Sequence, residues 1–249
     1  MAKFILGIGY AFATSVPLFL YSAGVESQIK VREYSNHKLY IDCSIRAPVL
    51  FEFNLTKDLS TLRPQESFSF DPDLPRSCQQ TSIGPYKGSL DGIRFRQGLL
   101  VDSNTMDMSF RTIQETYMMP NVVPMSHVLR NGGWKYTNDF QECEREISDI
   151  YVIGGAVYSN PNNDIFRQSH GIPTPNHLWK VIFYKDTHVA WMLPNDNTVS
   201  YDETNKYLAT IGEIEAVVGY QLFPEDVDRR FVASPRLIST DRKPKCKFS

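Results

Sequence analysis

The alternation of apolar and polar residues divides the first half of the chain into three predicted parts. Residues 4–25 form an uncharged apolar run as long as the ~20 residues that a helix needs to cross a bilayer core. Residues 27–44 and 47–55 then alternate between apolar and polar side chains, which predicts strands of a mixed sheet. Residues 62–92 are rich in Pro, Gly, Ser and Asp and therefore predict an irregular surface connection.

Further along, the pattern predicts a helix followed by a buried strand. Phe140, Cys143 and Ile147 recur at helical spacing within a polar segment, and the run from Tyr151 to Tyr158 is apolar. The two together form one helix-then-strand unit.

Two interpretations fit the apolar run at residues 4–25. Small residues at 22–24 and the glycosylation sequon at 54–56 favour a cleaved secretory signal. The run is longer than the apolar core of a usual signal, and Lys3 is the single charge before it, which favours a retained membrane helix. We therefore expect a membrane anchor, with a cleaved signal and the secretory pathway as the alternative.

Length and composition bound the rest of the chain. With 249 residues, 42% of them hydrophobic and 22% charged, the chain can bury the core of one substantial domain. The formal net charge of -2 gives no support for non-specific nucleic-acid binding, which draws its affinity from Lys and Arg. The densest basic run is the tail at residues 241–249, and a solvated tail or a subunit contact explains it better than a nucleic-acid arm.

The four cysteines, Cys43, Cys78, Cys143 and Cys246, lie far apart in the sequence and form no Cys-x-x-Cys pair. This spacing argues against a zinc knuckle and against a thioredoxin-like redox motif. In an oxidising compartment Cys43 and Cys78 could form a disulfide, but buried or unpaired thiols fit the sequence about equally well.

The most specific motif lies within residues 94–138. Around Gly98, Asn121, Pro124 and Trp134 it resembles the DNA/RNA non-specific endonucleases, the family that includes endonuclease G. Two further residues in register are Glu115 and Thr116. The resemblance implies an α+β fold of the ββα-metal (His-Me finger) type, in which helices flank a mixed or antiparallel central sheet.

The resemblance extends, in the same order, over roughly residues 38 to 226. Before the motif it rests on Arg63, Phe68, Asp71, Pro72, Leu74 and Pro75. After the motif it rests on Gly154, Gly155, Ile172, Pro173, Thr174, Lys180 and Val181, and in an expected closing helix on Ile214, Glu215, Gly219, Phe223 and Pro224.

The residues that would carry the chemistry differ from those of the active family. Active members end their central strand in Asp-Arg-Gly-His, whereas this chain has Arg96, Gln97, Gly98 and Leu99. The histidine would act as general base because its pKa lies near neutrality, and Leu99 cannot accept a proton. Gln97 puts a neutral amide in the place of a guanidinium that would stabilise phosphate charge.

The positions that would bind the metal differ as well. The resemblance places Arg130 where active members have the Mg²⁺-binding Asn, and Asn138 where a Glu would hold the water shell of the metal. A cationic Arg repels Mg²⁺, which prefers hard oxygen ligands. Asn121 and Asn131 are weak substitutes, the latter because a one-residue shift turns a helical side chain by about 100°. We therefore assign no catalytic, cofactor-binding or metal-binding residue and expect no cofactor.

These observations predict an anchor at residues 1–25, a linker at 26–37, an endonuclease G-like domain at 38–230 and a basic tail at 231–249. We expect a catalytically inactive, membrane-anchored pseudonuclease that is an accessory or structural subunit of a larger complex. Resemblance to endonuclease G implies the mitochondrial inner membrane, with the soluble domain in the intermembrane space and a complex of the respiratory-chain type as host.

The expected partners are the other subunits of that complex and, through residues 4–25, membrane lipids. Two alternatives remain at this stage. One is an active Mg²⁺-dependent endonuclease with non-standard catalytic residues, and the other is a nuclease-like protein that binds nucleic acid without cleaving it.

Overall fold

The computed structural model of the chain describes residues 28–60, 62–63, 65–160, 164–224 and 226–232. The predicted anchor at residues 4–25 and nearly all of the predicted basic tail lie outside these ranges. Within the described ranges, no helix is both long and apolar enough to span a membrane.

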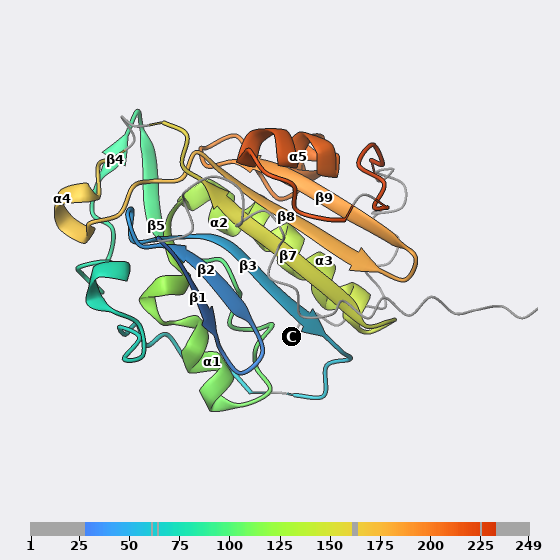
Figure 1. Cartoon of the computed structure of the whole chain (residues 1–249), viewed down its shortest axis with the longest axis horizontal. Helices are drawn as coiled ribbons and strands as arrows, with labels where there is room; N and C mark the ends of the chain where they lie inside the picture. The colour runs from blue at the N-terminus through green and yellow to red at the C-terminus, as the bar shows by residue number, and fades with distance from the viewer. Residues whose placement is uncertain (1–27, 61, 64, 161–163, 225, 233–249) are drawn as a thin grey trace, which may run out of the picture.

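Two antiparallel sheets form the frame of the described domain (Figure 1). The larger sheet has the strand order β1-β2-β3-β7-β8-β9, and the smaller sheet has the order β4-β5-β6. The strands are β1 Ile29–Glu33, β2 Lys38–Asp42, β3 Ala47–Leu55, β4 Ser89–Leu90, β5 Ile93–Leu99, β6 Val122–Ser126, β7 Ile150–Val157, β8 His177–Tyr184 and β9 Thr187–Pro194. The predicted α+β class is confirmed, and the paired strands in both sheets run antiparallel.

Helices cover both faces of the larger sheet. Figure 1 shows α3 on one face and α5 on the other, and each helix contributes to a separate buried cluster. The α-helices are α1 Phe110–Thr116, α2 His127–Asn131, α3 Gly133–Arg145, α4 Arg167–His170 and α5 Ile211–Val218. Short 3₁₀ turns are η2 Arg76–Cys78, η3 Met119–Asn121 and η4 Thr204–Tyr207.

The side chains of β8 alternate between the two faces of the larger sheet, so this strand contributes to the buried cluster on each face. Leu178 and Ile182 join Trp134 of α3 in one cluster, whereas Trp179 and Val181 join the cluster under α5. Successive side chains of a strand point to opposite faces, so a strand covered on both sides reads as a continuous apolar run. The larger sheet is therefore the rigid layer on which α3 is held.

The strand and helix predictions are largely confirmed. The runs 27–44 and 47–55 contain β1, β2 and β3, and the helix-then-strand unit is α3 followed by β7. One boundary differs, because residues 26–37, expected as a linker, include β1. This strand pairs with β2 from Ile29 opposite Asp42 to Glu33 opposite Lys38, so the folded domain begins before Lys38.

The segment 62–92 is irregular and mostly exposed, as predicted, but a short part of it is buried. Gln79, Gln80 and Tyr86 are buried. Gln79 donates to two carbonyl oxygens of its own loop, at 2.6 and 2.8 Å. Gln80 donates to the carbonyl oxygen of Val122 at 2.5 Å and accepts from the Tyr86 hydroxyl at 2.6 Å. These side-chain amides bond main-chain carbonyl oxygens that no neighbouring strand or helix satisfies, which allows this part of the segment to be buried.

α3 is shorter, and its buried face more polar, than the sequence pattern indicates. The helix ends at Arg145, so Ile147 lies beyond it and is 52% exposed. Trp134 is buried at the start of the helix, and Gln141 and Arg145 are buried further along. Of the apolar positions in the pattern, Phe140 does pack on the sheet, with its ring 5.5 Å from those of Tyr184 and Trp191, whereas Ile147 does not.

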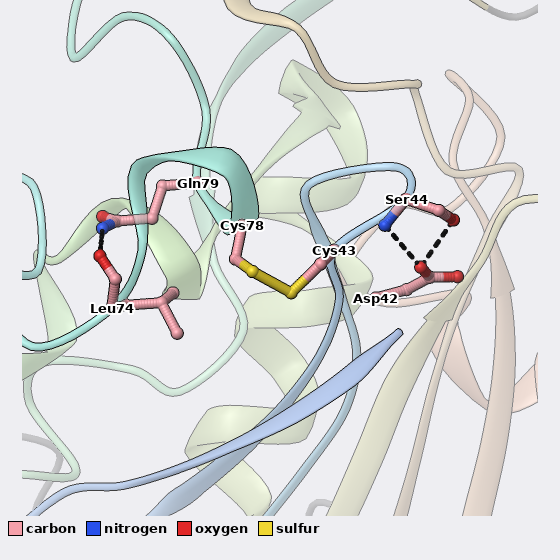
Figure 2. Close-up of a disulfide and its surroundings, with 6 residues drawn as sticks. All are labelled: Asp42, Cys43, Ser44, Leu74, Cys78 and Gln79. Atoms are coloured by element: carbon pink, nitrogen blue, oxygen red, sulfur yellow. Dashed lines mark hydrogen bonds between the residues drawn. A yellow bond between two sulfur atoms is a disulfide. The ribbon is translucent and has the colours of Figure 1, made fainter. Parts of the chain in front are cut away.

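A disulfide joins Cys43, in the turn after β2, to Cys78 at the end of η2 (Figure 2). Asp42 stabilises the same turn by accepting from the Ser44 amide at 2.8 Å and from its hydroxyl at 2.6 Å. The bridge spans 35 residues of sequence, and the loss of chain entropy in the unfolded state makes such a link worth about 4 kcal/mol. Cys143 is disulfide-bonded as well.

Candidate functional site

The residues that the resemblance assigns to the nuclease site meet at one pocket, which has a volume of about 340 Å³. The pocket lies between β5, the loop that follows β5, and the junction of α2 with α3. It is lined by Gln97, Leu99, Arg130, Asn131, Trp134 and Asn138, with further residues from loops on either side. The structure therefore brings together the sequence-predicted positions, with the exception of Arg96 and Asn121.

A break between two helices shapes one wall of the pocket. α2 ends at Asn131, and α3 begins at Gly133 after Gly132, whose φ and ψ are -105° and -104°. A Cβ atom on Gly132 would lie 2.5 Å from the carbonyl oxygen of Val199, so the break requires glycine. Arg130 and Asn131, the last two residues of α2, both line the pocket. The rotation of one residue within α2 does not keep Asn131 out of the pocket, and its Nδ2 donates to the main-chain carbonyl oxygen of His127 at 2.9 Å.

β5 supplies the opposite wall. A Cβ atom on Gly98 would lie 2.5 Å from the Cβ of Met125 on the paired strand β6, so a side chain at this position would push the strands apart. The Gln97 side chain donates to the carbonyl oxygens of Ile83 and Gly84 at 3.0 and 3.2 Å, which holds the preceding loop. Arg96 is exposed and does not line the pocket.

Leu99 lines the pocket at the position where the resemblance expects the general base. Its main-chain carbonyl oxygen accepts a hydrogen bond of 2.9 Å from the indole nitrogen of Trp134. This bond joins β5 to α3 at the site. The side chain of residue 99 has no atom that can take a proton.

Asn138, at the position of the expected acidic residue, is bonded to a buried cation. The Lys180 ammonium group donates to Asn138 Oδ1 at 2.6 Å and lies 4.2 Å from the centroid of the Trp134 ring. Lys180 is only 1% exposed. Burial lowers the pKa of the Lys180 ammonium to about 7, although Asp102, Glu142 and Asp139 favour its charged form.

Asn121 lies inside the scaffold, away from the pocket. It is fully buried, its Oδ1 accepts from the amide of Val101 at 2.9 Å, and its Nδ2 donates to the carbonyl oxygens of Val101 and Thr116, both at 2.8 Å. All of its polar atoms therefore fasten the loop after β5 to α1. Asn121 therefore does not line the pocket, and its side-chain oxygen is bonded to the amide of Val101.

Acidic side chains dominate the remaining lining of the pocket. They are Asp58, Glu66, Asp102, Asp139, Glu142 and Glu146. Against these six carboxylates stand two lining cations, Arg130 and Lys135, a formal excess of four negative charges. Burial raises the pKa of Asp102, and it raises the pKa of Glu142 to about 7 against the opposing effect of Arg145.

Arg145 forms ion pairs with several of these carboxylates and lies buried beside the pocket. It is 3% exposed, and its guanidinium lies 2.5 Å from Asp58, 2.9 Å from Glu142 and 4.0 Å from Asp107. It also donates to the carbonyl oxygen of Thr105 at 3.2 Å. One buried cation thus fixes three segments of chain around the pocket.

The donor set does not fit the Mg²⁺ ion that the resemblance implies. Arg130 brings a positive charge to the expected ligand position, and the oxygen of Asn138 is bonded to the Lys180 ammonium. Among the described residues, no three His, Cys, Asp or Glu side chains are grouped so that they could hold a metal ion. None of the described histidines lines the pocket either.

Most of these features were absent from the sequence interpretation. The six carboxylates come from separate segments, although Asp139, Glu142 and Glu146 share helical spacing that could have revealed them. Lys180 was identified only as a scaffold match, and its bond to Asn138 joins residues 42 positions apart. No local pattern indicates such a pairing.

Comparison with known proteins agrees with the fold. The chain is similar to the mitochondrial nuclease EXOG of Xenopus laevis, with 22% identity across 79% of this chain and 59% of that protein. It is 21% identical to human mitochondrial nuclease EXOG across 78% of this chain and 57% of that protein. The chain thus spans less than three fifths of the length of these relatives.

Among solved structures, a chain of the EndoG/EndoGI complex superposes with a TM-score of 0.60 at 17% identity, covering 80% of this chain and 87% of that chain. This likeness concerns the fold alone. The profile of the DNA/RNA non-specific endonucleases matches residues 15–229, which is most of the sequence. The chain therefore belongs to the DNA/RNA non-specific endonuclease family.

Proposed function

We propose that this chain is a catalytically inactive member of its family, which has kept the nuclease scaffold and lost the nuclease chemistry. One observation carries the proposal. In the pocket where the family site is expected, Leu99 replaces the base, Arg130 replaces a metal ligand, and the Asn138 oxygen is bonded to the buried ammonium of Lys180.

The loss of the base has a large kinetic effect. A positioned general base typically contributes about 10² to 10⁴ in rate, and neither Leu99 nor any histidine in the described pocket can supply it. The metal normally stabilises charge on the phosphate and activates water, and the donor set here does not fit Mg²⁺. The proposed protein therefore lacks both the general base and the metal ion on which the family chemistry depends.

The charge of the pocket also opposes a phosphodiester substrate. Proteins that bind nucleic acid without sequence specificity neutralise phosphates with Lys and Arg. The lining side chains of this pocket instead carry a formal excess of four negative charges, part of which the buried cations Arg145 and Lys180 neutralise, so the pocket offers no basic surface to a polyanion. The negative charge of the pocket also argues against a protein that binds nucleic acid without cleaving it, because the nucleic acid would bind in this same pocket.

The full-length protein, purified in mild detergent, tests this directly. It is incubated with plasmid DNA and with RNA in the presence of Mg²⁺ or Mn²⁺, beside an authentic nuclease as positive control. A matched variant carries Gln97→Arg, Leu99→His, Arg130→Asn and Asn138→Glu. We expect no cleavage by the unaltered protein; turnover that survives further purification would overturn the proposal.

A second candidate is an active nuclease that uses a different base. The observation that favours it is Glu142, a pocket carboxyl whose pKa is raised by burial to about 7. We rank it second because Glu142 is already bonded to Arg145 at 2.9 Å and to the Thr105 hydroxyl at 2.9 Å. If cleavage is observed, Glu142→Gln should abolish it, and Glu142→Gln should have no effect on a contaminating nuclease.

For the cellular role we propose an accessory or structural subunit of a mitochondrial inner-membrane complex of the respiratory-chain type. Residues 4–25 would anchor the chain in the membrane, with the domain in the intermembrane space. The support is the apolar run itself and the mitochondrial designation of the EXOG relatives.

Native gels of mild-detergent membrane extracts test this role. We expect the tagged chain to migrate with a large complex, and to lose that position when residues 4–25 are deleted. Migration as a free monomer in extracts that keep the respiratory complexes intact would refute the subunit role. That result would leave the question of catalysis untouched, because the nuclease assay addresses it separately.

A further inference from the structure

Four apolar side chains are exposed at one end of the domain, and we call them the apolar patch. Leu59 is 90% exposed, Phe110 69%, Ile147 52% and Met108 43%. They come from three segments, namely the loop after β3, the start of α1 with the residues before it, and the turn between α3 and β7. Exposed apolar side chains that gather in one place mark a site of interaction, whereas scattered ones need no explanation.

The loop after β3 is bonded to the segment before α1. The Ser60 hydroxyl donates to the main-chain carbonyl oxygen of Asp107 at 2.5 Å. Leu59 directly precedes the donor and Met108 directly follows the acceptor, so these two apolar side chains belong to segments in contact. Figure 1 shows the end of β3 and α1 in its lower part, at the same end of the domain.

The same loop is bonded to the end of α3. The Asp58 amide donates to Glu146 Oε1 at 3.1 Å, and the Asp58 carboxylate lies 2.5 Å from the buried Arg145 guanidinium. Leu59 follows Asp58, and Ile147 follows Glu146. Polar groups of the domain therefore hold the apolar patch in place, and its exposed side chains can be replaced with little effect on stability.

The apolar patch adjoins the acidic pocket. Asp58 and Glu146, the sequence neighbours of Leu59 and Ile147, both line the pocket. Six carboxylates line it, against two lining cations and the two buried cations beside it, so its formal charge stays negative. An exposed apolar surface and an acidic pocket thus lie next to each other.

The exposed charges around the apolar patch do not reverse this sign. Arg111 of α1 is paired with Glu115 at 3.0 Å. Lys57 and Asp149 are both exposed, and their charges are opposite. The surface that a partner meets is therefore apolar on one side and acidic on the other.

The charge decides which kind of occupant fits the apolar patch. A membrane surface with anionic lipids attracts basic segments of proteins, so the carboxylates beside the patch oppose a bilayer. In a twofold dimer the same surface faces itself, which would bring two acidic pockets together. A segment of another protein that carries Lys or Arg beside apolar side chains complements both parts of the surface.

We propose that the apolar patch and the acidic pocket form one docking surface for such a basic and apolar segment of a partner protein. Apolar side chains of the partner cover the patch, and a Lys or Arg side chain enters the pocket. Phe68, Tyr117 and Trp134 also line the pocket, and aromatic rings attract cations. Burial of the apolar side chains supplies affinity, while the opposite charges fix the orientation of the partner.

The inference rests on the proposed subunit role and adds to it the chemistry of the neighbouring subunit. The former nuclease pocket is then used for its carboxylates, which the apolar patch makes accessible to a protein rather than to a nucleic acid.

Site-specific photocross-linking tests the docking surface. The full-length chain carries benzoylphenylalanine in place of Leu59 or, as a control, in place of Val217. Val217 is 48% exposed on α5, which covers the opposite face of the larger sheet from α3 (Figure 1). Intact membranes from cells that contain the natural partners are irradiated, and the cross-linked peptides are sequenced by mass spectrometry.

We expect position 59 to cross-link to another protein, within a peptide that carries Lys or Arg beside apolar residues. Position 217 should give no cross-link to that protein. A cross-link from position 59 to lipid, to a second copy of this chain or to an acidic peptide would overturn the proposal, and so would the absence of any cross-link.

Substitutions separate the acidic contribution from the apolar one. Glu66→Gln combined with Glu146→Gln removes two exposed pocket carboxylates, and we expect it to lower the yield from position 59 at least threefold. Phe110→Ser combined with Ile147→Ser should lower the yield similarly. Asp91→Asn, in the exposed turn between β4 and β5, removes a carboxylate elsewhere and should leave the yield unchanged.

Equal yields in all of these variants would refute the docking surface, and a thermal melt of each establishes that the domain is folded. The outcome is distinguishable from failure of the proposed function. A chain that migrates with a large complex on native gels but gives no cross-link from position 59 refutes this surface alone, whereas a chain that migrates as a free monomer refutes the subunit role and this inference with it.

Discussion

His37 is a buried base whose protonation should make the stability of this protein depend on pH. It is 3% exposed, and neither ring nitrogen has a hydrogen-bond partner among the residues that the structure describes. Its ring stacks on Tyr34 with centroids 4.5 Å apart. Burial lowers the pKa of His37 to about 4; Glu115 nearby opposes this effect, and Arg32 adds to it.

The sign follows from the two states. The unfolded chain takes up a proton as the pH falls through the ordinary histidine pKa of 6.5, whereas the folded chain does so only near 4. Stability is therefore complete above pH 6.5 and is lost as the pH falls towards 4. Linkage between these two values gives a loss of about 2 kcal/mol between pH 7.5 and pH 5, and about 3 kcal/mol once both states are protonated.

The assay compares the unaltered chain with His37→Phe, which keeps a ring against Tyr34 and removes the titration. Urea unfolding is followed at pH 7.5 and at pH 5 in detergent at constant ionic strength. We expect the drop in unfolding free energy between the two pH values to be about 2 kcal/mol smaller in His37→Phe. Equal drops in the two proteins would show that His37 is not a buried neutral base, and the reasoning would be wrong.

Four further predictions concern other features. Replacing both Cys43 and Cys78 with Ser should lower the unfolding free energy by about 4 kcal/mol, as measured by urea unfolding, and an unchanged midpoint would contradict the disulfide. Gly98→Ala should cost about 1–3 kcal/mol in the same assay because it overpacks β5 against β6, and a neutral effect would count against this pairing. Arg145→Met should cost about 3–5 kcal/mol by leaving buried carboxylates unpaired, so a stable variant would refute the network. The exposed Asn54 should carry no glycan if the protein is mitochondrial, and a gel shift after glycosidase treatment would instead support the secretory alternative.

Much of the fold was predictable because its determinants are local or ordered along the chain. Alternation predicts β3, and the apolar run after a polar helix predicts β7. The resemblance to the family predicted the strand that carries Gly98 and the helix that carries Trp134. These predictions succeeded because each rests on a short stretch of sequence that forms one element.

The residues of the site that belong to the motif could be predicted from the sequence, but the contacts between distant segments could not. Leu99 and Arg130 could be placed in the pocket because they lie within the motif. The bond from Lys180 to Asn138 could not, since it joins two elements through space, and the break at Gly132 depends on contact with Val199. Sequence reasoning thus identified which groups were missing but not which groups had taken their place.

The hydrogen bond between Trp134 and residue 99 has a consequence for how such a protein can arise. Trp134 bonds to the main-chain carbonyl oxygen of Leu99, so the junction of β5 with α3 is indifferent to the identity of the side chain. Histidine and leucine codons differ by a single nucleotide. An exchange of histidine for leucine at this position therefore takes one nucleotide change and leaves the hydrogen bond between β5 and α3 in place.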